Sequence, residues 1–241
     1  MGPYEQLSVD RHGQVFVITM QKPPENRLNQ RYAQEIIRAF RDIEKELGTD
    51  TEGCVITRGN DAKFWCTGLE LDETDTNPYA NSDGFYPLIA TILDFPFPTI
   101  ALLTGHTFGG ACPYALAHDY RIMNANRGFF SMPPINLGLH FDGIGLLPRG
   151  KLHPQVARKL LLEAHKFTGK EAFEAGIVDA IAPPDKMFEV ALAKAREVAP
   201  RAKMGVYSLL RNELYGDAQQ RIRGISYVHG RVTSRPAKAK I

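Results

Sequence analysis

The sequence is poor in the features that mark secreted, membrane-spanning and nucleic-acid-binding proteins. Only three cysteines occur among 241 residues, Cys54, Cys66 and Cys112, and their spacing fits neither a disulfide framework nor a zinc site. No run of 18 or more apolar residues is present, so we expect no membrane-spanning helix. A net charge of +2 argues against a dedicated nucleic-acid partner. We therefore expect neither nucleic-acid nor membrane partners, and a reducing compartment.

The two ends of the chain carry different information about location. The N-terminus has no basic segment followed by an apolar one, so it does not look like a signal peptide. The C-terminal triplet Ala239-Lys240-Ile241 is similar to the small-basic-aliphatic address that peroxisomal import receptors bind. We expect a peroxisomal protein with such a receptor as partner; the alternative is a frayed basic tail on a cytoplasmic protein.

Hydrophobic periodicity predicts an α/β fold. Residues 14–20, 53–58 and 98–104 are β-branched and apolar, which is typical of strands. Residues 30–47 place apolar side chains on one helical face after a candidate cap at Asn29. Because strands and helices alternate, the core is expected to be a parallel or mixed sheet covered by helices.

The predicted organisation has three parts along the chain. We expect a core domain over residues 1–185, a C-terminal helical region over 186–234 and a flexible tail over 235–241. Within the core, residues 59–86 are polar and rich in Gly, Asp and Asn, and we interpret them as a long mobile loop with a functional role.

Two glycine-containing segments suggest a site for a carbonyl oxygen. One runs over residues 64–71 (FWCTGLEL) and the other over 104–112 (TGHTFGGAC), each where a strand gives way to a turn or helix. Glycine allows close approach of a ligand to backbone N–H groups, and two converging N–H groups would form an oxyanion hole. The alternative for each segment alone is a turn or packing device.

Five motifs in order resemble the enoyl-CoA hydratase/isomerase (crotonase) superfamily. Besides the two glycine segments, they are the strand Asp119-Tyr120-Arg121-Ile122, the segment 133–139 (PPINLGL) and the segment 168–179 (TGKEAFEAGIVD). The similarity extends from residue 14 to about 215. The segments 64–71 (FWCTGLEL) and 117–120 (AHDY) look most similar to the Δ3,Δ2-enoyl-CoA isomerase branch.

The resemblance implies a fold, an assembly and a set of site residues. The fold would be a spiral of ββα turns with a C-terminal helical region, assembled as homotrimers or dimers of trimers. The N–H groups of Leu69 and Gly110 would form the oxyanion hole for an acyl-CoA thioester. No metal or redox cofactor is implied, and coenzyme A is counted as part of the substrate. The other residues expected to bind substrate are Arg27, Lys63, Cys66, Gly68, Phe108, Gly109, Leu139 and His140.

The sequence departs from the family where catalytic carboxylates are expected. The two glutamate positions of the hydratases are Pro113 and Pro134 here, and proline has no side-chain base. Asp142 matches the position of an aspartate found in the dienoyl-CoA isomerase and 4-chlorobenzoyl-CoA dehalogenase branches. With apolar neighbours, burial would raise the pKa of such a carboxyl group toward a value useful for proton transfer. The alternative is that Asp142 caps a helix beginning near Gly143.

Three functions remain open from the sequence. The first is an isomerase-like 1,3-proton transfer with Asp142 as the catalytic base. The second is hydration, or another specialised acyl-CoA reaction that uses Asp142. The third is non-catalytic acyl-CoA binding, since both glutamate positions are proline.

Overall fold

The computed structural model of the chain describes residues 3–225, apart from the side chains of residues 74 and 75. Its main element is a six-stranded sheet in the order β1-β2-β3-β5-β7-β9. Only β1, which pairs with β2, is antiparallel to its neighbour. The strands are β1 (Leu7–His12), β2 (Val15–Met20), β3 (Cys54–Gly59), β5 (Thr99–Leu103), β7 (Tyr120–Asn124) and β9 (Ala180–Ala182).

A second, three-stranded sheet has the order β4-β6-β8 and is entirely parallel. Its strands are β4 (Phe64–Cys66), β6 (His106–Phe108) and β8 (Phe130–Ser131). Along the chain, β3 leads into β4, β5 into β6 and β7 into β8, and helices follow each pair. The α/β spiral of ββα turns that the sequence predicted is therefore confirmed.

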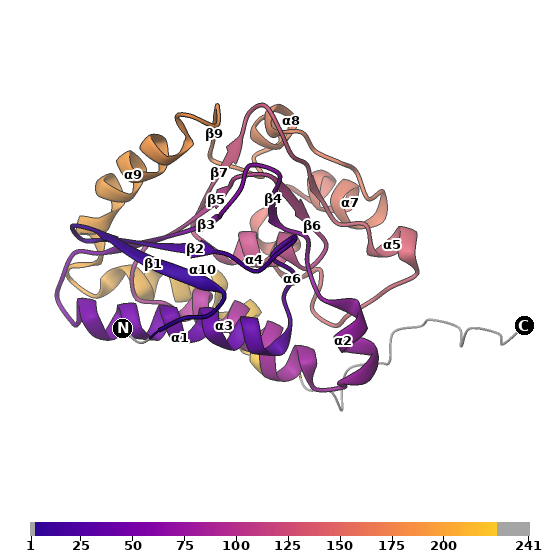
Figure 1. The fold of residues 1–241 in the computed structure, drawn as a ribbon, viewed down its shortest axis with the longest axis horizontal. Coiled ribbons are helices and arrows are strands. Elements are labelled where there is room, and N and C mark those ends of the chain that lie inside the picture. Colours follow the sequence, from indigo (N-terminus) through magenta and orange to yellow (C-terminus); the bar gives the residue numbers. More distant parts are fainter. Residues whose placement is uncertain (1–2, 226–241) are drawn as a thin grey trace, which may run out of the picture.

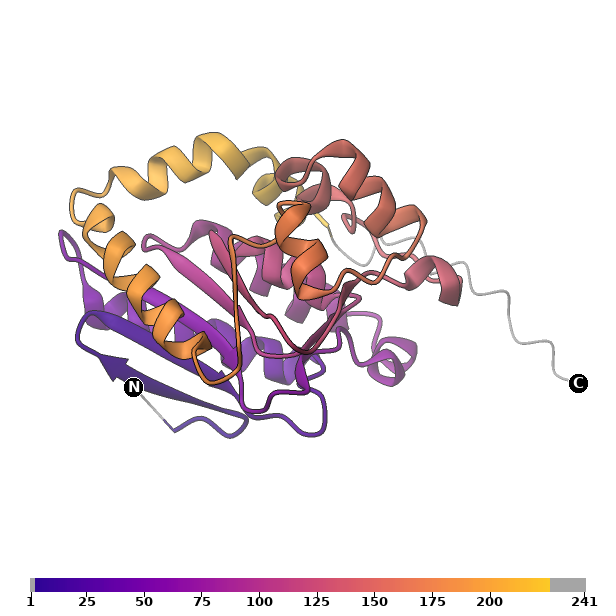
Figure 2. The ribbon, with the colours of Figure 1, turned by 90° about the horizontal axis from the view of Figure 1, so that it is seen from above.

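Helices cover both faces of the large sheet (Figures 1 and 2). On one face α9 packs against β2, β3, β5, β7 and β9. On the other side α1, α3 and α4 join the larger hydrophobic core. The helices are α1 (Gln30–Leu47), α2 (Leu71–Thr76), η1 (Asn81–Phe85), α3 (Tyr86–Asp94), α4 (Ala111–Ala117), α5 (Pro134–Leu137), α6 (Leu146–Lys151), α7 (Pro154–Leu162), α8 (Gly169–Glu174), α9 (Met187–Val198), η2 (Ala199–Ala202) and α10 (Val206–Arg223).

Helix α1 illustrates how local sequence sets an element. Asn29 caps its start, and the Asn29 side chain accepts a hydrogen bond from the N–H of Tyr32. Apolar residues at helical spacing, from Tyr32 to Leu47, are buried. Gly48 ends the helix with a positive φ of 73°. The expectation of a helix over 30–47 is confirmed.

The prediction of a long loop over residues 59–86 was wrong. The segment contains β4, α2 and the π-helix η1. Strand β4 is only three residues long, and its pairing partner β6 lies about forty residues further along the chain. Short elements that depend on distant partners leave little periodicity in the sequence. The polar composition therefore indicated a loop where tertiary pairing forms a strand.

The C-terminal elements lie against the core. Helix α9 forms part of the layer over the large sheet, and α10 packs mainly on α3. Residues 226–241 lie outside the described part of the chain, and so do the predicted tail and the triplet Ala239-Lys240-Ile241. Within residues 3–225, no helix combines the length and apolar character needed to cross a membrane.

Candidate active site

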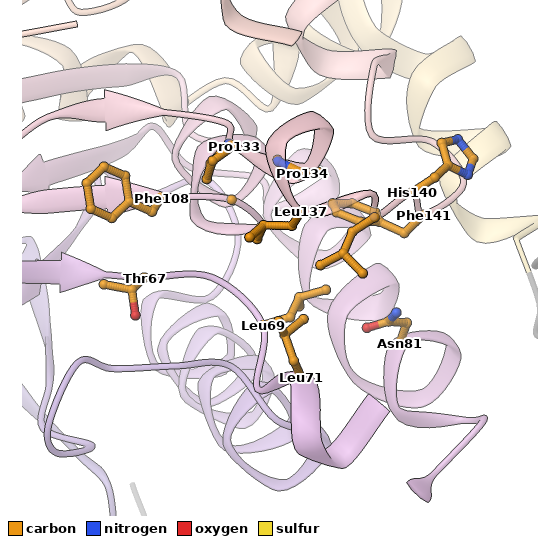
Figure 3. A pocket seen from close by; sticks show the side chains of 13 residues that line it. Thr67, Leu69, Leu71, Asn81, Phe108, Pro133, Pro134, Leu137, His140 and Phe141 are labelled. Carbon is orange, nitrogen blue, oxygen red and sulfur yellow. The ribbon is translucent and has the colours of Figure 1, made fainter. Parts of the chain in front are cut away.

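A cleft opens where the strands of the small sheet end. Leu69 lies three residues after β4, and Gly110 two residues after β6. Since the three strands are parallel, their carboxyl ends meet at one edge, where α/β proteins commonly bind ligands. The cleft has a volume of about 730 Å³, open to solvent (Figure 3). Its described lining residues are Thr67, Leu69, Leu71, Asn81, Phe108, Gly109, Gly110, Pro133, Pro134, Leu137, Leu139, His140 and Phe141.

The backbone at Leu69 is oriented by a parallel β-bridge to Leu28. The N–H of Leu28 donates to Gly68 O at 2.7 Å, and the N–H of Glu70 donates to Leu28 O at 2.9 Å. Because alternate peptide groups of a strand point in opposite directions, the N–H of Leu69 faces away from Leu28. Within residues 3–225 this N–H donates no hydrogen bond. It is therefore free to bind a ligand oxygen.

The second free donor is the N–H of Gly110 at the start of α4. The first N–H groups of a helix have no intrahelical acceptor, and this one donates to no other described residue. Gly109 before it has a φ of +58° and donates to Ser131 O at 3.0 Å, which fixes the turn.

The two donors lie beside each other. A β-carbon added to Gly110 would lie 3.5 Å from the nitrogen of Leu69, and one added to Gly68 would lie 2.9 Å from the nitrogen of Gly110. Gly68 also has a φ of +96°, which side chains other than hydrogen rarely allow. The structure thus brings the predicted residues Leu69, Gly68, Gly109 and Gly110 together at one cleft, in an arrangement that fits an oxyanion hole.

Glu70 fixes the loop that carries the first donor. Its carboxylate accepts hydrogen bonds from the Lys22 ammonium and the Asn29 amide, both at 2.8 Å. The hydrogen bond from Lys22 is the main cause that lowers the pKa of Glu70. An ionised, doubly bound carboxylate holds the Leu69 peptide in place and is not available as a base.

The wall of the cleft is apolar. Leu69 and Leu137 approach the same space from opposite sides (Figure 3). The described lining residues include no aspartate or glutamate; their polar side chains are those of Thr67, Asn81 and His140. His140 is exposed, and its ring is turned away from the cleft in Figure 3. The cleft therefore suits an uncharged carbonyl compound with an apolar substituent.

Pro134, Pro113 and Asp142 occupy three different places around this wall. Pro134 is buried and lines the cleft at the first turn of α5. Pro113 lies in α4 and lines a separate small cavity behind Phe141. Asp142 directly follows Phe141, is half-buried and is not among the residues lining the cleft. Its carbonyl oxygen accepts the hydroxyl hydrogen bond of Tyr86 at 2.9 Å, and no side-chain cap at the start of α6 involves it.

Three other predicted residues surround the cleft without lining it. Cys66 is fully buried, and its thiol donates to Asn26 O at 3.0 Å; burial raises its pKa to about 12. Arg27 is exposed, pairs with Glu25 at 2.8 Å and donates to the Thr67 hydroxyl at 3.3 Å. Lys63 is exposed, with its ammonium 4.8 Å from the centre of the Phe64 ring.

His106 shows that the rim beside Phe108 is basic. Its ring stacks on Phe108, with centroids 5.1 Å apart. Burial lowers the pKa of His106, and the nearby charges of Arg127, Lys63 and Lys166 lower it further. Sequence reasoning had singled out only Lys63 here. Arg127 and Lys166 carried no local signal, because they come from loops around β8 that meet only in the fold.

Asn81 and Leu137 were also missed. Asn81 belongs to the segment interpreted as a loop, and the π-helix η1 brings it to the cleft. Within the described residues no group of three or more His, Cys, Asp or Glu side chains could hold a metal ion. The expectation that no metal cofactor is used stays a prediction.

The chain is an α/β protein, a spiral of ββα turns with two unused peptide N–H groups at one apolar cleft. Comparison with known proteins identifies the group. Residues 10–229 match the enoyl-CoA hydratase/isomerase family. The chain therefore belongs to that family, the crotonase superfamily.

Individual relatives differ in their reactions. The chain is 31% identical over 223 residues to the peroxisomal enoyl-CoA delta isomerase 2 of Arabidopsis thaliana, covering 86% of this chain and 91% of that one. It is 26% identical to the carnitinyl-CoA dehydratase of Citrobacter koseri, covering 88% and 80%. Human mitochondrial delta3-delta2-enoyl-CoA isomerase has the same fold, with a TM-score of 0.82, 20% identity and coverage of 90% and 86%.

Proposed function

We propose that the protein binds an enoyl-CoA thioester in this cleft and moves its double bond by a 1,3-proton transfer, as an enoyl-CoA isomerase does. The observation that carries the proposal is the pair of adjacent, unused N–H groups of Leu69 and Gly110 above an apolar cleft. Relatives named as enoyl-CoA delta isomerases, at 29 to 31% identity, support this choice among the reactions of the family.

The chemistry follows from where charge develops. Removal of the α-proton of a thioester places negative charge on the carbonyl oxygen, and two N–H donors at that position stabilise the enolate. The proton then returns at the γ-carbon, which shifts the double bond. An apolar wall keeps water from the intermediate and strengthens both hydrogen bonds.

We assign the proton transfer to Asp142. It is the carboxylate that directly follows the lining residues Leu139, His140 and Phe141. The Tyr86 hydroxyl donates a hydrogen bond to the carbonyl oxygen of Asp142. Tyr86 lines the small cavity that lies behind Phe141. In this assignment the turn over residues 139–142 reorients when substrate binds, so that the carboxylate reaches the α-carbon.

The basic rim supplies a place for the CoA phosphates. Arg27 donates to the hydroxyl of Thr67, which lines the cleft. Lys63, Arg127 and Lys166 lie near the His106 ring, which stacks on the lining residue Phe108. Exposed lysines and arginines at the mouth of an apolar cleft favour a ligand with a charged head and an uncharged acyl group.

One observation favours a second candidate, a protein that binds acyl-CoA without turning it over. Pro134 lines the cleft where the resemblance places a catalytic glutamate, and no described lining residue is a carboxylate. Hydration through two glutamates has the least support, because Pro113 and Pro134 both lack a side-chain base.

The test is turnover of trans-3- and cis-3-enoyl-CoA in deuterated water, followed by mass spectrometry, for the protein and for Asp142→Asn. The isomerase proposal expects conversion to the 2-enoyl ester with deuterium incorporated, and loss of both in the variant with CoA-ester binding kept. Binding without exchange in the unmodified protein would select the non-catalytic candidate. Unchanged exchange in Asp142→Asn would reject that residue as the base.

We also propose self-association through α10. Five apolar side chains on and just before this helix are exposed. Neighbouring exposed apolar side chains often mark a protein–protein interface. Met204 is 82% and Leu214 71% exposed, and the others are Val206, Leu209 and Leu210. Light scattering on Leu210→Glu/Leu214→Glu should report a smaller particle than the unmodified protein; equal masses would reject this surface.

Peroxisomal import remains part of the proposal. Two relatives with about 30% identity are named as peroxisomal enzymes, and the triplet Ala239-Lys240-Ile241 resembles the import address. A fluorescent fusion that keeps the native C-terminus should label peroxisomes, and removal of the triplet should leave it in the cytoplasm. Cytoplasmic signal from both fusions would favour the alternative location.

A further inference from the structure

The cleft of the candidate site is closed on one side by Phe141. The Phe141 ring meets the Phe85 ring edge to face, with centroids 5.7 Å apart and planes at 89°. The small cavity behind these rings, which Pro113 also lines, has room for about one water molecule. An acyl chain whose thioester oxygen is bound at Leu69 and Gly110 therefore does not continue behind Phe141 and lies among the lining residues of the cleft.

The polar side chains that line this cleft are those of Thr67, His140 and Asn81. The Thr67 hydroxyl donates to the Glu25 carboxylate at 2.8 Å. The His140 ring is turned away from the cleft (Figure 3). Within residues 3–225, the Asn81 carboxamide forms no hydrogen bond. Among the described lining residues, Asn81 is therefore the one whose side chain offers a free polar group to a ligand in the cleft.

The π-helix η1 sets the position of Asn81. Its wide turn is closed by the N–H of Tyr86, which donates to Asn81 O. Such turns are rare and often lie at functional sites. Gly84 lets η1 pack closely on α1, because a β-carbon on Gly84 would lie 2.8 Å from the Cα of Gln30. Packing thus fixes the Asn81 backbone before a ligand binds, which lowers the entropy cost of a contact with it.

The surroundings of the Asn81 carboxamide are apolar. Figure 3 shows it directed toward the side of the cleft that Leu69 and Leu71 form. A bound hydrocarbon chain would displace water from the carboxamide without giving it a hydrogen-bond partner, which is unfavourable. A chain that carries an oxygen atom at this place avoids that cost. Since a carboxamide both donates and accepts and is uncharged, it suits a hydroxyl or a ketone.

We propose that Asn81 binds an oxygen-containing group on the acyl chain and so determines substrate specificity. The preferred substrates are CoA esters that carry a hydroxyl or a ketone on the carbons just beyond C4, outside the segment through which the double bond moves. This inference rests on the proposed binding of CoA esters in this cleft. A site that hydrogen-bonds a substrate oxygen discriminates against the analogue without it, because its own polar group is then left unpaired.

The test compares the affinities of hexanoyl-CoA, 5-oxohexanoyl-CoA and 6-hydroxyhexanoyl-CoA by calorimetry. These saturated esters have no double bond to move, so binding is measured by itself. We expect at least one oxygenated ester to bind about tenfold more tightly than hexanoyl-CoA, the effect of one hydrogen bond. Asn81→Leu should remove this preference without weakening hexanoyl-CoA binding. Asn136→Leu is the matched control, because Asn136 is exposed on α5 and does not line the cleft.

A second variant separates hydrogen bonding from effects on the fold. An ionised carboxylate only accepts, so Asn81→Asp should lose a preference for the ketone ester and keep one for the hydroxyl ester. Equal affinities of the unmodified protein for all three esters, or a preference that survives Asn81→Leu, would overturn the proposal. Equal weakening of all three esters in Asn81→Leu would also overturn it, since Asn81 would then contact a part of the ester that they share. Failure of all three esters to bind the unmodified protein would reject the proposed function itself, so the two failures are distinguishable.

Discussion

Gly68 and Gly110 lie so close that a β-carbon on Gly68 would be 2.9 Å from the nitrogen of Gly110 and 2.7 Å from Phe108 O. These two glycines follow different strands of the small sheet, β4 and β6, and their contact sets the separation of the Leu69 and Gly110 donors. The positive φ of Gly68 adds a second reason for glycine at this position.

Gly68→Ala should therefore separate the donors. We expect deuterium exchange into enoyl-CoA to fall by about 10²–10³, the usual effect of losing one oxyanion donor. Gly176→Ala is the control, because Gly176 also has a positive φ, of +69°, and no atom lies within 4 Å of an added β-carbon. It should lose about 1–2 kcal/mol of stability with exchange unchanged. Equal losses of exchange in both variants would refute a specific role for Gly68.

The Lys22–Glu70 ion pair should contribute a pH-dependent coupling energy to the free energy of unfolding. The Lys22 side chain is 10% exposed and that of Glu70 36%, so the pair is intermediate between a surface and a buried ion pair. A double-mutant cycle with Lys22→Met and Glu70→Gln should give a coupling of about 1–2 kcal/mol in urea denaturation near pH 7.

The sign of the pH dependence follows from the direction of the shift. Lys22 lowers the folded-state pKa of Glu70 below its ordinary value, so the coupling is fully present above that ordinary value, about 4.3. It should disappear as the pH falls through the lowered value. A coupling that stays constant down to the acid transition would show that the pair contributes nothing through charge.

Lys151 should make stability rise with pH on the alkaline side. Its ammonium donates to His118 O at 2.9 Å and lies 4.1 Å from the centre of the Tyr215 ring. Burial lowers its pKa to about 7, and the surrounding charges are Arg121, Asp119, Arg211 and Asp179. Between about pH 7 and 10 the unfolded chain then binds more protons than the folded one, so the free energy of unfolding increases with pH.

Lys151→Met removes this linkage without leaving a carbonyl unsatisfied, since Arg121 also donates to His118 O at 2.9 Å. The advantage of the variant in urea midpoint should be greatest below pH 7 and should shrink toward pH 10. Parallel midpoint curves for the two proteins across this range would show that Lys151 stays charged throughout.

The three cysteines should be unreactive in the folded protein. All are buried, and burial raises the pKa of Cys66 to about 12 and raises those of Cys54 and Cys112 as well. At pH 8 the thiolate fraction of Cys66 is therefore about 10⁻⁴, and only thiolates react readily. Mass spectrometry after iodoacetamide treatment should find no adduct until denaturant is added. Rapid labelling of the native protein would contradict the burial of these side chains.

The sequence by itself determined the family and the fold. Five motifs in order were enough, and four of them contain a glycine with positive φ: Gly68, Gly109, Gly138 and Gly176. The sequence also shows directly that both glutamate positions of the family are occupied by proline, at Pro113 and Pro134. The helix over 30–47 followed from a cap and a 3.6-residue period, which are local signals.

Tertiary structure decided everything that depends on distant segments meeting. Strand β4, the cleft residue Asn81 and the basic rim of Arg127 and Lys166 have no local signature, because the segments that they meet are not adjacent to them in the chain. The side of Phe141 on which Asp142 lies was equally hidden. Periodicity records which face of an element is buried, whereas only packing fixes what that face meets.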